Sequence, residues 1–378
     1  MRAYVFTDKA LERVAGQFVW LSVNTEKASN AAFVQKYTIS AWPTLYIIDP
    51  VKEAVTKRWV GGATVPQLLN LLHEGEQLAG KTRGLQAALA GAEKTYGAGS
   101  YKESVPQFQK VLSQAPPKWP QYGHTVESLL YALSTSGDDL GCTELAMAAL
   151  PRVRGTSSEG NVAASGLGCA LAVDKKETMR SEWVKTFEIA SQKALDNPRL
   201  DLSGDDRSGI YIGLIDARDD LGDKEGKQRI AEQWATFLER EAAKAKTADA
   251  RSVYDSHRLG AYLELGHPER AVEMLEASER DLPDDYNPPA RLAVAWLALK
   301  QYDKALAASD RAMAKAYGPR MLGILRTRAD IYQAMGNSAE AQKTVEKAIS
   351  FAEALPDGQR SDRQIQSLKK KLESLTKS

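Results

Sequence analysis

The feature that most constrains this chain is a spaced pattern of residues that recurs in its last third. In each copy an aromatic residue is followed four positions later by glycine or lysine, and nine positions later by alanine. The three copies are Tyr262-x3-Gly266-x4-Ala271, Trp296-x3-Lys300-x4-Ala305 and Tyr332-x3-Gly336-x4-Ala341. Their separations of 34 and 36 residues indicate stacked supersecondary units rather than one globular core.

These residue types suit a pair of antiparallel helices. The alanine lets the second helix approach the first, and the aromatic side chain fills the space between them. The glycine or lysine closes the first helix, and a proline such as Pro283 ends the unit. One pair cannot bury its own apolar face, so neighbouring pairs must stack. The pattern resembles the tetratricopeptide repeat, whose unit is about 34 residues long.

Upstream the repeat weakens but the helical signal continues. Gly99-x4-Ser104 repeats the second half of the pattern, while Thr95 holds the aromatic position. Helices are expected near residues 124–136, 139–152, 158–173, 178–195, 207–221 and 226–244. The sequence therefore predicts an all-α helical repeat domain over residues 85–358. A capping helix over 359–378 should follow, because an end repeat needs a polar outer face; contact with an acidic partner is the alternative for its basic residues.

The concave face of such a helical solenoid is the predicted partner-binding surface, since it forms an extended trough suited to a peptide or a helix. The expected groove residues are Ser256, Glu264, Val294, Leu297, Arg326, Asp330 and Gln333. Each of them could equally be an ordinary exposed helix position. The family's clamp for chaperone C-termini uses Lys and Asn, whereas this chain has Ser256, Ala290 and Arg326 at corresponding positions. We therefore do not expect a chaperone-tail clamp.

The first eighty residues have a different character. Helices are expected over residues 5–17 and 29–37, and strands over 18–23, 45–48 and 55–60. A last helix should begin at Val65, with Thr64 as its N-cap and Pro66 in its first turn. Alternating elements with short connections predict an open mixed α/β sheet covered by helices.

This segment resembles a thioredoxin fold through FVWLSVNTE, KYTISAWPT, LYIIDP and RWVGG. The resemblance implies a thioredoxin-like domain over residues 1–78, lacking the family's first strand, and a linker over 79–84. Trp42, Pro43 and Thr44 stand at the place of the family's cis-proline motif. By that resemblance they would bind an extended substrate.

The family's Cys-x-x-Cys is missing, and dithiol chemistry needs such a pair at a helix N-terminus. The sequence therefore offers no catalytic residue. Some thioredoxin-like proteins carry Met and Phe just after this motif, with the spacing that Met1 and Phe6 keep. Two hypotheses stay open: the chain starts just past a Cys-x-x-Cys, or the domain never carried one.

The two cysteines, Cys142 and Cys169, lie on neighbouring predicted helices. If 139–152 and 158–173 run antiparallel, both thiols lie at the same distance from the turn. They could form a disulfide, or they could be two small buried residues at a helix crossing.

Charge and composition exclude several classes of function. Fifty basic and 49 acidic residues give a net charge of +1, which provides no field to hold nucleic acid. No apolar stretch reaches the roughly 20 residues of a membrane span. The four histidines show no metal-ligand spacing, and Asp255-Ser256-His257 cannot chain a catalytic triad along one helix. We expect no metal and no cofactor.

These observations support two hypotheses for function. In the first, the intact gene product handles thiols and disulfides or binds clients, and the solenoid selects the protein or peptide partner. In the second, the chain is a non-enzymatic scaffold with a structural thioredoxin-like part. The start Met1-Arg2-Ala3-Tyr4 shows no signal peptide. An extracytoplasmic location would require one upstream, and the cytoplasm is the alternative. The sequence does not predict the oligomeric state.

Overall fold

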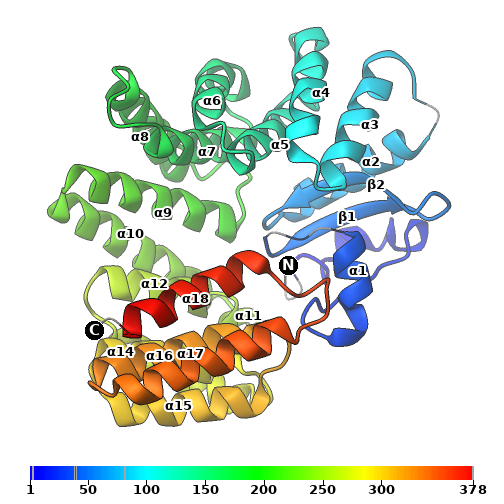
Figure 1. Ribbon diagram of the computed structural model, residues 1–378. Helices are drawn as coiled ribbons and strands as arrows, with labels where there is room; N and C mark the ends of the chain where they lie inside the picture. Colours follow the sequence, from blue (N-terminus) through cyan, green and yellow to red (C-terminus); the bar gives the residue numbers. More distant parts are fainter. Residues whose placement is uncertain (2–3, 38, 40, 81, 377–378) are drawn as a thin grey trace. The chain divides into compact units, whose positions relative to one another are not determined.

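The computed structural model describes residues 1, 4–37, 39, 41–80 and 82–376, which are mostly helical (Figure 1). The chain forms two compact units. Unit 1 consists of Met1–Val19 and Tyr37–Ile230, and unit 2 consists of Trp20–Lys36 and Ala231–Ser378. This grouping does not follow the linker expected over residues 79–84, because residues 20–36 fold with the C-terminal helices.

Unit 1 contains a two-stranded sheet. Strands β1 (Thr44–Asp49) and β2 (Ala54–Val60) pair antiparallel, with Thr44 opposite Val60. Helix α2 (Val65–Ala79) packs on them and starts in a capping box, in which Thr64 and Gln67 satisfy each other's backbone N–H groups. The predicted N-cap at Thr64 is confirmed.

The predicted strand over residues 18–23 is wrong. These residues, all of which the structure describes, form no ladder, and Val19 and Leu21 are 88% and 75% exposed. A strand needs a neighbour for its backbone N–H and C=O groups, but β1 pairs with β2 and the chain joins unit 2 from Trp20 onward. The predicted thioredoxin-like sheet is therefore not formed in the described residues.

The two helices predicted around that strand are also shorter than expected. Residues 5–17 make the 3₁₀ turns η1 (Lys9–Leu11) and η2 (Ala15–Gln17) in place of an α-helix. The helix predicted over 29–37 appears as the turn η3 (Ala28–Asn30) followed by α1 (Ala31–Lys36).

The rest of unit 1 is a run of antiparallel helices, close to the bounds predicted from sequence. They are α3 (Gly84–Gly97), α4 (Tyr101–Gln114), α5 (Tyr122–Thr135), α6 (Asp139–Val153), α7 (Ser158–Ala172), α8 (Arg180–Asp196) and α9 (Gly204–Leu221). One continuous apolar core runs through them, centred on fully buried side chains such as Leu89, Phe108, Leu130 and Phe187.

Helix α10 (Lys224–Ala243) crosses the boundary between the units in sequence. Unit 2 then continues as α11 (Ala248–Ser252), α12 (Asp255–Glu264), α13 (Glu269–Asp281), α14 (Asn287–Ala298), α15 (Tyr302–Lys315), α16 (Arg320–Ala334), α17 (Ser338–Glu353) and α18 (Asp362–Thr376). The last of these agrees with the predicted C-terminal helix, and it buries Ile365, Leu368 and Leu375.

In unit 2 the residues of the spaced pattern have the packing and turn roles predicted from their types. The three alanines, Ala271, Ala305 and Ala341, are fully buried at the starts of α13, α15 and α17. The residues that close α12, α14 and α16 all adopt left-handed backbone: Gly266 (φ 74°), Lys300 (φ 58°) and Gly336 (φ 76°). Unit 2 is therefore a stack of helical hairpins, as expected.

Candidate functional site

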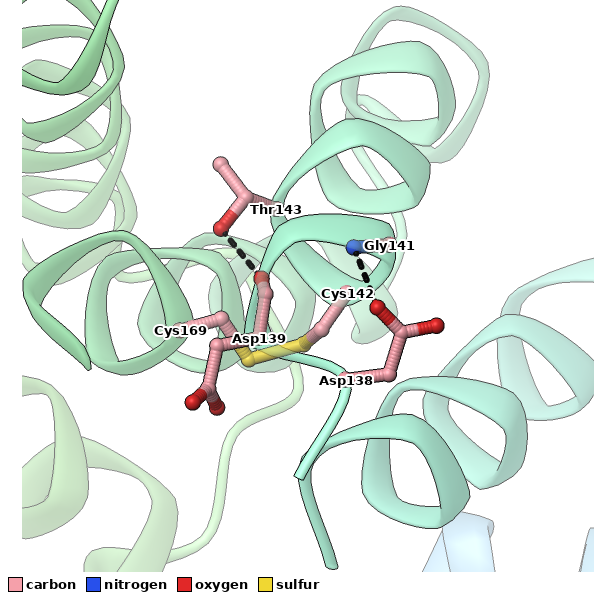
Figure 2. Close-up of a disulfide and its surroundings, with 6 residues drawn as sticks. All are labelled: Asp138, Asp139, Gly141, Cys142, Thr143 and Cys169. Carbon is pink, nitrogen blue, oxygen red and sulfur yellow. Dashed lines mark hydrogen bonds between the residues drawn. A yellow bond between two sulfur atoms is a disulfide. The ribbon is translucent and has the colours of Figure 1, made fainter. Parts of the chain in front are cut away.

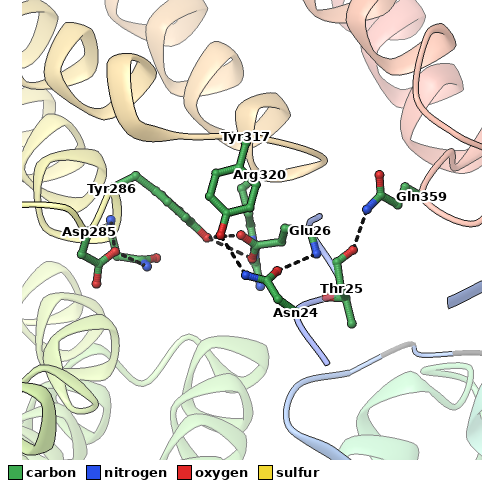
Figure 3. A network of polar contacts seen from close by, with 9 residues as sticks. Asn24, Thr25, Glu26, Asp285, Tyr286, Tyr317, Arg320 and Gln359 are labelled. Atoms are coloured by element: carbon green, nitrogen blue, oxygen red, sulfur yellow. Dashed lines mark hydrogen bonds and ion pairs between the residues drawn. The ribbon is translucent and has the colours of Figure 1, made fainter. Parts of the chain in front are cut away.

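In unit 2 a short turn-forming stretch of the chain lies against the turns between successive hairpins (Figure 3). We call residues 24–31 the docked segment. Its contacts come from the turns that precede α14, α16 and α18, and we call these residues the turn edge. The turn edge consists of Tyr286, Tyr317, Gly318, Arg320, Gly358 and Gln359.

The Glu26 carboxylate is the centre of the contact. The Tyr286 hydroxyl lies 3.0 Å from both carboxylate oxygens, and Arg320 Nε lies 2.6 Å from Oε1. Tyr286 is the N-cap of α14 and Arg320 is the first residue of α16, so the positive ends of two helix dipoles also face this region. Burial, and after it the Glu26 carboxylate, raises the pKa of Tyr286, which keeps its proton available for donation.

The backbone on both sides of Glu26 is held as well. Gln359, which is buried, donates from Nε2 to the carbonyl oxygens of Thr25 at 2.8 Å and Lys27 at 3.0 Å. Asn24 Nδ2 donates to the Tyr317 hydroxyl at 2.8 Å. The turn edge therefore contacts one acidic side chain together with the two carbonyls that flank it.

Hydrogen bonds within the docked segment also fix its conformation. Asn24 Oδ1 accepts from the Glu26 backbone N–H at 2.9 Å, the short-range bond typical of an Asx turn. Asn30 Nδ2 donates back to the Asn24 carbonyl at 2.8 Å. These bonds bend the segment so that Glu26 points toward the turns before η3 begins.

Two glycines allow the backbones to come this close. A Cβ on Gly318 would overlap the Glu26 carbonyl oxygen, and a Cβ on Gly358 would overlap that of Ala31. Gly318 also has φ 58°, a conformation that favours glycine. Any other residue at either position would push the segment away.

The groove residues predicted from sequence lie on α12, α14 and α16. Ser256, Glu264, Arg326 and Gln333 are exposed, and Val294, Leu297 and Asp330 are half-buried. Asp330 forms an ion pair with Lys371 of α18. Sequence reasoning missed the turn edge, whose signal was the glycine in each of the turns 316–320 and 356–361.

The cis-proline motif of the thioredoxin resemblance lies in unit 1. The Trp42–Pro43 bond is cis, and Gly61 N–H donates to the Pro43 carbonyl at 2.9 Å. Thr44 begins β1 and its hydroxyl donates to the Ala41 carbonyl, while Trp42 is 58% exposed. The role of these three residues in substrate binding stays a prediction.

Unit 1 contains a buried charged cluster that sequence analysis did not identify. Lys57 Nζ lies 2.5 Å from Glu93 Oε1 and 3.3 Å from Glu74 Oε2, and His124 Nδ1 lies 3.4 Å from Glu74 Oε1. Burial alone would raise the pKa of Glu74, but Lys57 and His124 outweigh it and lower that pKa to about 2. The charges pair off within the cluster, which joins β2 to α2, α3 and α5. These ion pairs therefore connect one strand to three helices.

Beside this cluster Arg58 lies among tyrosine rings. Its guanidinium carbon is 5.0–5.9 Å from the ring centroids of Tyr46, Tyr96, Tyr101 and Tyr131, and Nη1 donates to the Tyr101 hydroxyl at 2.7 Å. These cation–π contacts anchor the strand to α3, α4 and α5.

The structure joins Cys142 and Cys169 by a disulfide between α6 and α7 (Figure 2). Both residues are buried, and their Cα atoms are 6.0 Å apart. Near the bond, Asp138 caps α6 by accepting from the Gly141 N–H at 2.9 Å. The described part of the chain therefore contains no free thiol.

Other candidate chemistry does not assemble. Asp255 is fully buried whereas its neighbour Ser256 is exposed, so the two side chains cannot act together. Across the described residues, no group of three or more His, Cys, Asp or Glu is placed to hold a metal ion. Within the same residues, none of the helices combines the length and hydropathy that a bilayer crossing requires.

Comparison with protein families gives one match, a tetratricopeptide-repeat model over residues 327–354. This segment matches the tetratricopeptide repeat. It contains the third copy of the spaced pattern, with Tyr332, Gly336 and Ala341, and it spans the end of α16 and α17. The comparisons give no support to the thioredoxin resemblance of residues 1–78.

Several solved tetratricopeptide-repeat structures are similar to this chain. One from Parabacteroides merdae is 10% identical, with a TM-score of 0.49, and covers 78% of this chain and 99% of its own. A thermophilic TPR protein from Thermus thermophilus is 16% identical, with a TM-score of 0.26. The match covers 78% of this chain and 100% of that protein. The TPR2AB domain of yeast Sti1, solved in complex with pHSP90, is 17% identical, with a TM-score of 0.27. The match covers 76% of this chain and 98% of that domain. No curated protein matches the sequence.

Proposed function

We propose that this chain is a protein-binding scaffold, and that its C-terminal helical hairpins hold a peptide segment of a partner protein. The observation that carries the proposal is the docked segment. A stretch of chain more than 250 residues away in sequence lies on the turn edge, held through both side-chain and backbone bonds. Repeat solenoids bind their partners through such extended surfaces.

A second surface of unit 2 is also part of the proposal. The exposed groove residues on α12 and α16, Ser256, Glu264, Arg326 and Gln333, would contact a partner along the helices rather than at the turns. The thiol–disulfide hypothesis rests on a Cys-x-x-Cys that this sequence does not contain, and the comparisons give it no support.

A peptide-display experiment tests the proposal. A random-peptide library is selected against the full chain carrying Asn24→Ala/Glu26→Ala, which removes the side-chain contacts of the docked segment from the turn edge. Binders are then tested with Arg326→Ala/Gln333→Ala, Arg320→Ala or Lys110→Ala added to that chain. Lys110 is an exposed residue of α4 in unit 1 and serves as the control. We expect enriched peptides whose binding falls at least tenfold with substitutions in unit 2 and is unchanged by Lys110→Ala. A library with no peptide enriched over a blank surface would refute the proposal.

A further inference from the structure

We infer that the turn edge is a recognition site for a peptide turn that presents an acidic side chain, and that residues 24–31 of the same chain occupy it as a built-in competitor. The inference rests on the proposed protein-binding function and specifies its ligand class. A partner peptide would bind by displacing the docked segment, so the site would be self-occluded until such a ligand arrives.

Selectivity for an acid follows from the donors. Tyr286 and Arg320 both direct hydrogens at the carboxylate, and the Glu26 side chain is only 15% exposed. A glutamine in this place would offer Arg320 and the half-buried Tyr286 hydroxyl one neutral oxygen instead of two charged ones. Bonds in which one partner is charged are the ones most costly to lose.

The remaining contacts do not depend on which residues flank the acid. Gln359 donates to the carbonyl oxygens of Thr25 and Lys27, which any residue can offer. Gly318 and Gly358 admit the backbone itself. A ligand therefore needs an acidic residue in a turn of this shape. An asparagine two positions earlier would close the turn onto the backbone N–H of the acidic residue and add the bond to Tyr317.

Occlusion follows from tethering. A segment linked to its own site has an effective concentration in the millimolar range, so a free peptide of the same sequence binds the wild-type chain weakly. Removing the contacts of the docked segment leaves the turn edge intact and should open it to peptides in solution.

The probe is a fluorescein-labelled peptide with the sequence of residues 20–36, together with a second peptide in which Glu26 is replaced by glutamine. Binding is measured by fluorescence anisotropy to the full wild-type chain and to the full chain with Asn24→Ala/Glu26→Ala. We expect the substituted chain to bind the glutamate peptide at least tenfold more tightly than wild type does, and the glutamine peptide about tenfold more weakly than the glutamate peptide.

Further substitutions in the Asn24→Ala/Glu26→Ala chain locate the site. Arg320→Ala and Gln359→Ala should each weaken binding of the glutamate peptide about tenfold. Arg311→Ala is a matched control, because Arg311 pairs with Glu279 as Arg320 pairs with Glu26, at 2.7 and 2.6 Å and with nearly equal exposure. It should leave binding unchanged. Circular dichroism checks that each variant folds.

The outcomes separate the inference from the proposed function. Equal binding of the two peptides, or binding of the glutamate peptide that Arg320→Ala does not weaken, would overturn the inference. The scaffold would survive that result if the display library still yields binders sensitive to Arg326→Ala/Gln333→Ala. An empty display library would instead remove the proposed function.

Discussion

Lys57 and Glu93 form an ion pair that is closed off from solvent. Lys57 Nζ lies 2.5 Å from Glu93 Oε1, and the two side chains are 1% and 0% exposed. Burial alone would lower the pKa of Lys57, but the Glu93 and Glu74 carboxylates outweigh it and raise that pKa. The pair connects β2 to α3, so the hairpin is fixed to the helices of unit 1 by charge as well as by packing.

Removing one partner of this pair should be costly. Lys57→Met takes the cation away from two carboxyls, Glu93 and Glu74. Burial already raises the pKa of Glu93, so without Lys57 this group must either take up a proton or stay charged in the interior. We expect a loss of about 3–5 kcal/mol in the free energy of unfolding of unit 1. Urea denaturation followed by circular dichroism measures it. Lys57→Met/Glu93→Leu should recover more than half of the loss, because it removes both charges. Lys52→Met is the control: Lys52 is 70% exposed in its ion pair with Asp49, and its loss should cost less than about 1 kcal/mol. Equal stability of Lys57→Met and wild type would contradict the structural role of the cluster.

Two glycines of α7 should respond oppositely to alanine. A Cβ on Gly166 would overlap the Phe187 ring and lie 2.8 Å from Ala146 Cβ, whereas nothing lies within 4 Å of one on Gly168. Gly166→Ala should destabilise unit 1 by about 1–3 kcal/mol through overpacking. Gly168→Ala should stabilise it by about 0.5–1 kcal/mol, because alanine is the better helix former. Thermal unfolding of both variants provides the comparison, and the same sign of change in both would speak against this packing.

Lys300 closes α14 with left-handed backbone, a conformation that costs a residue with a Cβ about 1–2 kcal/mol. The equivalent positions in the neighbouring hairpins are Gly266 and Gly336. Lys300→Gly should therefore stabilise unit 2, by about 0.5–1 kcal/mol after glycine's greater freedom in the unfolded chain is counted. The reciprocal change Gly266→Lys should destabilise it. Chemical denaturation of the two variants tests the pair, and a loss of stability from Lys300→Gly would be inconsistent with a strained turn.

The helical part of the fold could be predicted because its signal is local and repeated. Ala271, Ala305 and Ala341 each report on a close approach between two helices adjacent in sequence, and three copies reinforce one another. Thr64 was equally readable, since a cap and its partner lie three residues apart. The prediction of a strand over residues 18–23 was wrong because a strand needs a neighbouring strand to pair with. The local sequence FVWLSV does not show whether such a neighbour is present.

The candidate site was harder to predict for the same reason. Glu26 and Tyr286 are 260 residues apart, and their contact depends on the path of the whole chain. The buried Lys57 did leave a readable sign, because it alternates with Val55 and Trp59 on the face of β2 that packs inward. A charged residue in an apolar alternation should have predicted a buried partner.

The Cys142–Cys169 disulfide can be tested by counting thiols. The denatured, unreduced protein should show no titratable thiol, and the reduced protein two. Because the bond closes a loop of 27 residues, its reduction should cost unit 1 about 3–4 kcal/mol on the chain-entropy account. Cys142→Ser/Cys169→Ser should reproduce the reduced stability. Two thiols in the unreduced protein would show that the pair is simply buried at the helix crossing.

Asp206 should make the stability of unit 1 depend on pH. Its carboxylate accepts from the Ser203 N–H and hydroxyl, both at 2.8 Å, in the capping box of α9. The pKa of Asp206 is raised from its ordinary value of 3.8 to about 7, mainly by burial. The hydrogen bonds from Ser203 lower this pKa, and the charges of Glu127 and Asp205 raise it further. The native state therefore keeps a proton that the unfolded chain loses as the pH rises.

Stability from this group should be fully present below about pH 4 and should fall as the pH rises to about 7, with no further change above that. Asp206→Asn removes the titration while its amide oxygen can still accept from Ser203. The difference in unfolding free energy between the variant and wild type should thus grow in favour of the variant across this window. Urea denaturation at a series of pH values measures the difference, and the values near pH 4, where neither native side chain is charged, provide the internal control. A difference that stays constant from pH 4 to pH 8 would mean that the Asp206 carboxyl ionises as it does in water.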